Sequence, residues 1–185
     1  TTDKVYLNKE WDFGYRENDT LGGFDPYSSS KAALEILLNS WRLSFSSKYK
    51  NLSLASARAG NVIGGGDWSE NRIIPDAIRA LKSDQNIRVR NPNATRPWQH
   101  VLEPLVGYLM QAEKMYESPG NYETSFNFGP FTSSNRKVSE LVNQILRVWE
   151  GNWIVEKKKY SNLHEANLLY LNIDKAVKLL GWEPK

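Results

Sequence analysis

A tyrosine and a lysine stand four residues apart in DPYSSSKAALE, the stretch from Asp25 to Glu35. On a helix, Tyr27 and Lys31 would share one face. A nearby ammonium group favours the phenolate form of a tyrosine, which lets the phenol exchange protons nearer neutral pH. The pair therefore has the chemistry of a base that takes a proton from a hydroxyl group. The same spacing also occurs on ordinary helices, where it is only an exposed aromatic and a charge.

A second group of reactive side chains opens the sequence. Thr2, Asp3 and Lys4 place a hydroxyl, a carboxylate and an ammonium group side by side, at what is expected to be the end of a strand. Strand ends are where α/β folds bind their ligands. When the stretch is considered alone, a capped turn is the better explanation.

Regular elements have to position these residues, and several helices are expected. Apolar residues recur at helical spacing from Tyr27 to about Tyr49, with Asp25 as the cap and Pro26 in the first turn. Further helices are expected within 71–84 (regular from about Pro75), at 100–116, at 137–150 with a cap at Thr132 or Ser134, and at 174–182 with Asp174 as the cap and Gly181 as the stop.

Short strands are expected between the helices, at 52–57, 87–90, 124–129, 153–156 and 168–172. Alternating strands and helices predict an α/β fold with a parallel sheet. A dinucleotide-binding fold usually begins with a strand, a G-x-G-x-x-G stretch and a helix. The sequence contains no such stretch, and Gly64, Gly65 and Gly66 lack the spacing.

The composition excludes several classes of function. The 185 residues are 40% hydrophobic and 24% charged, with a net charge of +3. The sequence has no basic block with interleaved aromatic residues, so nothing in it indicates nucleic-acid binding. There is no cysteine, which fits a reducing compartment, and two histidines make a histidine-rich metal site improbable. No apolar run is long enough to predict a membrane span, and no signal peptide is recognisable.

Longer stretches carry a more specific signal. The chain resembles the extended short-chain dehydrogenase/reductase family, and within it the nucleotide-sugar 4,6-dehydratases that act on CDP-glucose. The stretches that carry the resemblance are TTDKVYLNKEWDFGYRENDTLGGFDPYSSSKAALE, ARAGNVIGGGDWSENRIIPD, RPWQHVLEPLVGYL, FNFGP and HEANLLYLNIDKAVKLLGW. They occur over nearly the whole chain, and GNVIGGGDW followed by RPWQHVLEP is far more specific than Y-x-x-x-K.

The resemblance implies a reaction in three steps with a tightly held NAD. The sugar hydroxyl at C4 is oxidised, water is lost across C5 and C6, and hydride returns to C6. The product is a CDP-4-keto-6-deoxy sugar for deoxysugar biosynthesis, such as that of lipopolysaccharide O-antigen.

The resemblance also implies catalytic roles. Tyr27 would take the C4 hydroxyl proton, while Lys31 would assist it and hold the nicotinamide ribose. Thr2 would bond the C4 oxygen, and Asp3 would protonate the departing C6 hydroxyl. Lys4 stands where many related dehydratases carry a glutamate, and it would remove the C5 proton, which requires the neutral amine.

Five further residues are expected to bind the substrate. Asn61 suits the diphosphate or the sugar, while Arg72 and Arg96 suit phosphate oxygens because guanidinium groups match them. His164 and Glu165 lie where members of the family close over the nucleotide.

The expected domains follow from the same resemblance. Residues 1–66, with the helix 27–49, would form the last part of a Rossmann-like NAD-binding domain, which 100–130 would rejoin. Residues 67–99 and 131–185 would form a substrate-binding lobe. Since the glycine-rich half is missing from the sequence, we expect a piece of a longer enzyme that is inactive alone.

Alternatives remain open at this stage. Another epimerase or dehydratase of the family would share Tyr27 and Lys31 without needing Asp3 and Lys4, and a non-catalytic sugar-nucleotide-binding module would need none of them. We expect a cytoplasmic homodimer, formed through the Tyr27 helix, that contacts neither nucleic acid nor membrane.

Overall fold

A parallel pair of strands forms the centre of the larger region. The computed structural model covers residues 1–185 and describes all of them except 47, 50 and 157–167. β1 (Ser56–Ala59) and β6 (Ser125–Phe128) pair in parallel from Ser56↔Ser125 to Ala59↔Phe128. Every residue of β6 is buried, as expected of a strand covered on both faces.

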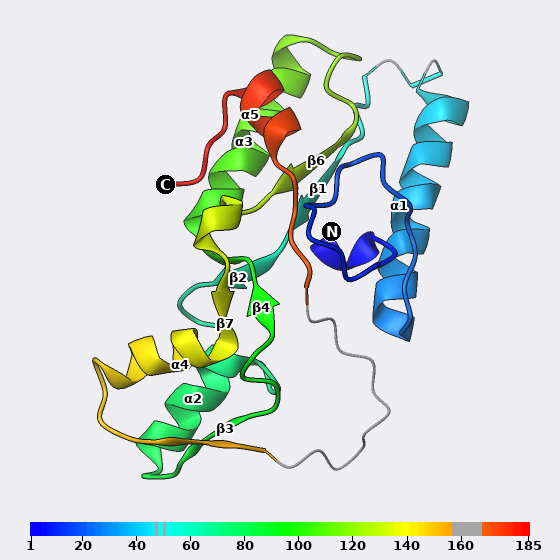
Figure 1. Ribbon diagram of the computed structural model, residues 1–185. Coiled ribbons are helices and arrows are strands. Elements are labelled where there is room, and N and C mark those ends of the chain that lie inside the picture. Colours follow the sequence, from blue (N-terminus) through cyan, green and yellow to red (C-terminus); the bar gives the residue numbers. More distant parts are fainter. Residues whose placement is uncertain (47, 50, 157–167) are drawn as a thin grey trace.

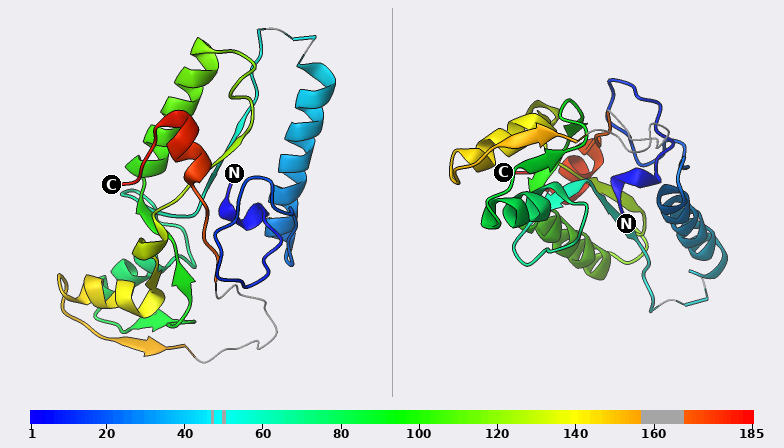
Figure 2. Two further views of the ribbon diagram at one scale, coloured as in Figure 1. Left: turned by 45° about the horizontal axis from the view of Figure 1, so that its top comes forward. Right: turned by 90° about the horizontal axis from the view of Figure 1, so that it is seen from below.

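Helices cover both faces of this pair. α1 (Pro26–Phe45) lies on one side, and α3 (Leu102–Glu117) with α5 (Asp174–Leu180) lies on the other (Figures 1 and 2). Gly107 lets α3 approach closely, because a β-carbon there would lie 2.3 Å from the ring of Phe128. The main core includes Tyr6, Phe126 and Trp182.

A smaller lobe lies below this region in Figure 1. It contains α2 (Ile73–Lys82), η2 (Thr132–Ser134), α4 (Val138–Leu146), the parallel pair β3 (Ile87–Val89) and β8 (Trp153–Val155), and the antiparallel pair β4 (Thr95–Arg96) and β7 (Arg136–Lys137). Its own core consists of Ala77, Leu81, Ile87, Val89 and Val142. β2 (Asn61–Ile63) and β5 (Trp98–His100) pair in parallel where the chain passes between the two regions.

The N-terminal residues hold a defined path rather than an irregular loop. They form the short helix η1 (Asp3–Val5) and single bridges between Thr2 and Ala59, Tyr6 and Leu21, and Tyr15 and Leu171. The rings of Tyr6 and Tyr15 stack with centroids 5.1 Å apart. The bridge between Thr2 and Ala59 attaches the TTDK stretch to the end of β1.

The predicted α/β class is confirmed, and all five predicted helices are present with shifted ends. α1 begins at Pro26 and ends at Phe45 rather than Tyr49, and Asp25 Oδ1 accepts a hydrogen bond from the Ser28 amide at 3.0 Å. α2 begins at Ile73, which places Pro75 in its first turn. A proline is tolerated there because the backbone nitrogens of the first turn donate no hydrogen bond within the helix. Gly181 ends α5 with φ of 70°.

Four local predictions were wrong. The first strand runs from Ser56 to Ala59 instead of 52–57, and 168–172 forms only an isolated bridge rather than a strand. The caps of two helices also differ: α4 is preceded by Lys137, whose amide donates to Glu140 Oε2, and α5 by Ile173. In the described part of the chain, no helix is long and apolar enough to cross a bilayer.

Candidate active site

The first turn of α1 sets the position of the tyrosine. Asp25 caps the helix, and Gly23 packs so closely on it that a β-carbon there would lie 2.4 Å from Ser28 Cβ. Tyr27 is 53% exposed, and Lys31 Nζ lies 5.6 Å from the centroid of its ring. The two side chains therefore share one accessible face of the helix.

The TTDK stretch forms a hydrogen-bonded corner. Asp3 is fully buried, and its Oδ1 accepts from Thr2 Oγ1 at 3.0 Å and from Lys4 Nζ at 2.7 Å. Lys4 Nζ also donates to Asn61 Oδ1 at 3.4 Å. Asp3 Oδ2 is buried and has no hydrogen-bond partner among the described residues. One oxygen of this carboxylate thus remains available.

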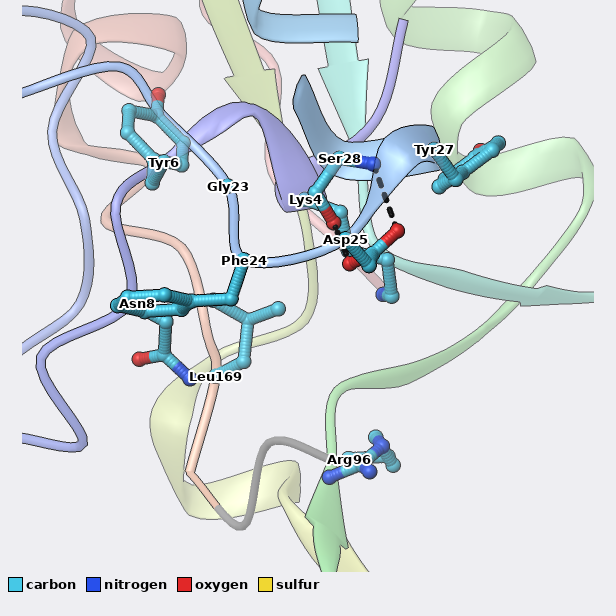
Figure 3. A pocket seen from close by; sticks show the side chains of 10 residues that line it. All are labelled: Lys4, Tyr6, Asn8, Gly23, Phe24, Asp25, Tyr27, Ser28, Arg96 and Leu169. Atoms are coloured by element: carbon cyan, nitrogen blue, oxygen red, sulfur yellow. Dashed lines mark hydrogen bonds between the residues drawn. The ribbon is translucent and has the colours of Figure 1, made fainter. Parts of the chain in front are cut away.

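Two cavities meet at this corner, and both are lined by Lys4, Tyr27 and Arg96. The smaller one has a volume of about 280 Å³ and also contacts Phe24 and Leu169 (Figure 3). The larger one has a volume of about 700 Å³, within the range of small-molecule sites.

The structure brings most of the predicted site residues to these cavities. The larger cavity is lined by the predicted residues Thr2, Lys4, Tyr27, Asn61, Arg72 and Arg96. Asp3 lies buried behind Lys4, and Lys31 lies beside Tyr27 without lining either cavity. His164 and Glu165 fall outside the described residues.

Arg72 and Arg96 differ in their surroundings. Arg72 is mostly exposed, and its Nη1 lies 3.3 Å from Asp67 Oδ2. Arg96 is buried on β4, and its Nη1 donates to its neighbour's carbonyl oxygen, Thr95 O, at 2.9 Å. In Figure 3, Arg96 reaches the smaller cavity from a different element than Lys4 and Tyr27.

A buried charged network, which sequence reasoning missed, ties α1 to the sheet. Arg58 Nη2 on β1 donates to Glu35 Oε2 at 2.7 Å, and Arg58 Nη1 donates to the Tyr6 hydroxyl at 2.8 Å. Ser56 Oγ also donates to Glu35 Oε2 at 2.7 Å. Glu35 lies one helical turn beyond Lys31, at the level where α1 packs on β1, and it is buried there.

The network perturbs its members in opposite directions. Burial alone would raise the pKa of Glu35, but hydrogen bonds from Arg58, Thr1 and Ser56 outweigh burial and lower the pKa to about 2. Burial raises the pKa of Tyr6 to about 12, although Arg58 partly opposes that rise. Glu35 is therefore a carboxylate and Tyr6 a neutral phenol at neutral pH.

Sequence reasoning also missed two arginines, Arg88 and Arg90, which line the larger cavity. They stand two residues apart on and just after β3, so they lie on one side of the strand. The alternation of these arginines with Ile87 and Val89 predicts from the sequence that they lie on the exposed face of the strand. The sequence does not predict that this face lines a cavity.

The family model for GDP-mannose 4,6 dehydratase matches residues 1–185. The chain belongs to this family. Among curated relatives, the CDP-glucose 4,6-dehydratase of Salmonella typhimurium is 42% identical over 191 residues, which cover all of this chain and 53% of that protein. An uncharacterised protein of Schizosaccharomyces pombe is 32% identical over 82 residues, which cover 44% of this chain and 21% of that protein.

Solved structures share the fold of this family member along its full length. The dTDP-glucose 4,6-dehydratase of Bacillus anthracis, in complex with NAD, has a TM-score of 0.75 and 19% identity over 55% of its chain. The dTDP-glucose 4,6-dehydratase of Streptomyces venezuelae, with NAD and TYD bound, has a TM-score of 0.79 and 19% identity over 53% of its chain. The UDP-glucuronic acid 4-epimerase of Bacillus cereus has a TM-score of 0.78 and 16% identity over 55% of its chain. The chain thus spans about half the length of these proteins, and its fold is that of their Rossmann-like class.

Proposed function

We propose that this chain carries the catalytic and sugar-nucleotide-binding residues of an NAD-dependent CDP-glucose 4,6-dehydratase. One observation carries the proposal: the accessible Tyr27 lines the same cavity as Thr2, Lys4 and Arg96. The cavity is of a size that accepts a nucleotide sugar. The 42% identity to the Salmonella enzyme supports CDP-glucose as the substrate.

The residues beside Tyr27 fit the ribose end of NAD. Lys31 Nζ makes no hydrogen bond to another described residue, and it lies on the accessible face beside the tyrosine. An ammonium group offers three donors, which suits the hydroxyls of a ribose. When bound, NAD supplies the acceptor for the hydride of C4 and returns it to C6.

In the first step, Tyr27 accepts the proton of the C4 hydroxyl, and Lys31 stabilises the phenolate that is needed for this. Thr2 lines the cavity and orients the C4 oxygen. The C4 ketone that results makes the C5 proton acidic, which prepares the elimination of water.

The Lys4–Asp3 contact can supply both groups that the elimination needs. A shift of one proton across the 2.7 Å contact from Lys4 Nζ to Asp3 Oδ1 turns the ion pair into a neutral amine and a carboxylic acid, and rotation of the carboxyl group then turns its O–H toward the substrate. The amine then takes the C5 proton, and the acid gives its proton to the departing C6 hydroxyl as water. These transfers restore the original ammonium and carboxylate.

The approach to Asp3 runs past Gly60. Gly60 lines the larger cavity, and a β-carbon there would lie 3.6 Å from Asp3 Oδ2, the oxygen without a described partner. The missing side chain leaves room for the C6 hydroxyl to reach that oxygen. Asp3 is buried and lines neither cavity, so Gly60 is the point of the cavity wall from which we expect the C6 hydroxyl to approach it.

A chimera tests the function directly. In it, this chain replaces the matching half of the Salmonella typhimurium CDP-glucose 4,6-dehydratase. Incubated with NAD and CDP-glucose, the chimera should form a 4-keto sugar, detected by its absorbance after alkali treatment. A folded chimera that binds CDP-glucose but forms no keto sugar would favour the alternative of a non-catalytic binding module.

Three further proposals accompany this function. The sequence predicted 1–66 and 100–130 for the NAD-binding domain and 67–99 and 131–185 for the substrate lobe. We keep these limits except at the C-terminal end, because α5 packs on β6 in the larger region and belongs with it. The location is the cytoplasm. The assembly is a homodimer through α1, whose exposed apolar residues include Ile36, Leu37 and Leu43.

A further inference from the structure

Four arginines line the larger cavity, and they come from three elements. Arg72 precedes α2, Arg88 and Arg90 belong to β3 and the residue after it, and Arg96 lies on β4. A diphosphate carries too little charge to need all four. Some of them are therefore available for another part of the ligand.

Arg88 differs from the other three in its contacts. Arg72 pairs with Asp67, and Arg90 Nη2 donates to the carbonyl oxygen of Asn71 at 3.1 Å. Arg88 is exposed and makes no hydrogen bond or ion pair with another described residue. A guanidinium group has five N–H donors, so its donors are available to a ligand in the cavity.

The backbone holds Arg88 firmly in spite of its exposure. Its neighbours Ile87 and Val89 are fully buried in the core of the smaller lobe, which directs Arg88 to the opposite face of β3. The strand also pairs with β8 in the register Arg88↔Ile154. The side chain therefore starts from a fixed point on the cavity wall.

The cavity has a direction. Tyr27 and Lys4 lie at the end that it shares with the smaller cavity, and Arg96 lines both. β3 belongs to the smaller lobe, away from the N-terminal segment (Figures 1 and 2). On the proposed function, a sugar at Tyr27 and a diphosphate at Arg96 leave the nucleoside to lie toward β3.

We propose that Arg88 binds the base of the nucleotide and selects cytosine over uracil. Cytosine presents two adjacent acceptors, O2 and N3, whereas uracil carries an N–H donor at N3. A guanidinium group has only donors, so its fork matches cytosine and meets a donor on uracil. This inference rests on the proposed function and names the part of the substrate that it leaves open.

The magnitude follows from comparable contacts. A bidentate contact between a side chain and a base edge discriminates against the wrong base by a factor of about 5 to 150. We expect the chain to bind CDP-glucose more tightly than UDP-glucose by a ratio in this range.

Calorimetric titrations of this chain with CDP-glucose and with UDP-glucose test the proposal. In Arg88→Met, the ratio of the two affinities should fall to within about twofold of unity, mainly through weaker CDP-glucose binding. Arg88→Lys keeps the charge but loses the fork, so it should also lose most of the ratio. The control Arg147→Met alters an exposed arginine that bonds Gln144 outside the cavity, and the ratio should stay unchanged. Because Arg88 is exposed, each variant should keep the thermal unfolding midpoint of the wild type.

The possible failures are distinguishable. If the wild type binds CDP-glucose and Arg88→Met keeps the same preference for it, the role of Arg88 is wrong while the proposed function stands. If the wild type binds both nucleotide sugars equally, the role of Arg88 is likewise wrong while the proposed function stands. If the wild type binds neither nucleotide sugar, the proposed function and the inference are both overturned.

Discussion

Glu35 and Arg58 form an ion pair inside the protein, with Oε2 and Nη2 2.7 Å apart and side chains only 1% and 4% exposed. The pair joins the helix that carries Tyr27 and Lys31 to β1. Arg58 also bonds the Tyr6 hydroxyl, which follows the Thr2–Lys4 corner by two residues. The two halves of the candidate site are thus attached to one buried group of charges.

Removing the charge of Glu35 should destabilise the fold. Glu35→Gln leaves Arg58 as a buried charge without its partner, which costs about 3–5 kcal/mol in the free energy of unfolding. Urea unfolding near neutral pH measures the loss. The control Glu117→Gln breaks an exposed pair with Lys114, so its cost should stay below about 1 kcal/mol. Equal losses in the two variants would contradict this account.

The same pair predicts a pH dependence. The pKa of Glu35 is lowered from 4.5 to about 2 in the folded chain, so its stabilisation is complete above 4.5 and is lost as the pH falls toward 2. The difference in unfolding free energy between wild type and Glu35→Gln should shrink by up to roughly 3 kcal/mol over that window. A difference that stays constant through the acid range would show that Glu35 is not perturbed.

Asp3→Asn should separate the two halves of the reaction in the chimera. The amide cannot protonate the departing C6 hydroxyl, but Tyr27 still takes the C4 proton. We expect the absorbance of NADH to accumulate while the 4-keto-6-deoxy product falls by about 10²-fold or more. An unchanged dehydration rate would show that Asp3 is not the acid of the elimination.

Gly60→Ala should block the approach to Asp3. The new β-carbon would lie 2.9 Å from Pro97 Cγ and 3.6 Å from Asp3 Oδ2, which narrows the path of the C6 hydroxyl. Turnover of the chimera should drop on the order of 10²-fold. Gly65 lines the same cavity, but nothing lies within 4 Å of its missing β-carbon, so Gly65→Ala should keep its activity. Similar activity in both variants would mean that the substrate does not pass Gly60.

The exposed face of α1 predicts an interface between two copies of the chain. Leu37 and Leu43 are 63% and 81% exposed, and burying such side chains contributes about 1.5–3 kcal/mol each. Leu37→Glu should shift the mass measured by light scattering from dimer to monomer. Gln144→Glu adds the same charge at an exposed position of α4, away from α1, and tests whether charge alone causes the shift. A monomeric wild type would exclude this interface.

Local signals predicted the start of α1 well. Asp25 and Pro26 act within one turn of the chain, so their effect is readable without the fold. The grouping of Tyr27 with the TTDK stretch came from a family resemblance, because no local rule places residues 23 positions apart on one cavity.

Predictions that depended on distant partners were less accurate. The stretch 168–172 looks like a strand, yet only Leu171 pairs, with Tyr15, which a local pattern cannot reveal. Glu35 and Arg58 were missed because charged residues are ordinarily exposed, and only the meeting of α1 and β1 makes them a pair. Tertiary contacts decided both cases.

The role of Tyr27 is tested most directly by Tyr27→Phe in the chimera, with turnover and CDP-glucose affinity measured on the same preparation. The phenylalanine keeps the ring and removes only the hydroxyl. We predict a turnover lower by about 10²- to 10⁴-fold with an affinity close to that of the unaltered chimera. Turnover at the unaltered rate would contradict the assignment of Tyr27 as the group that takes the proton from the sugar.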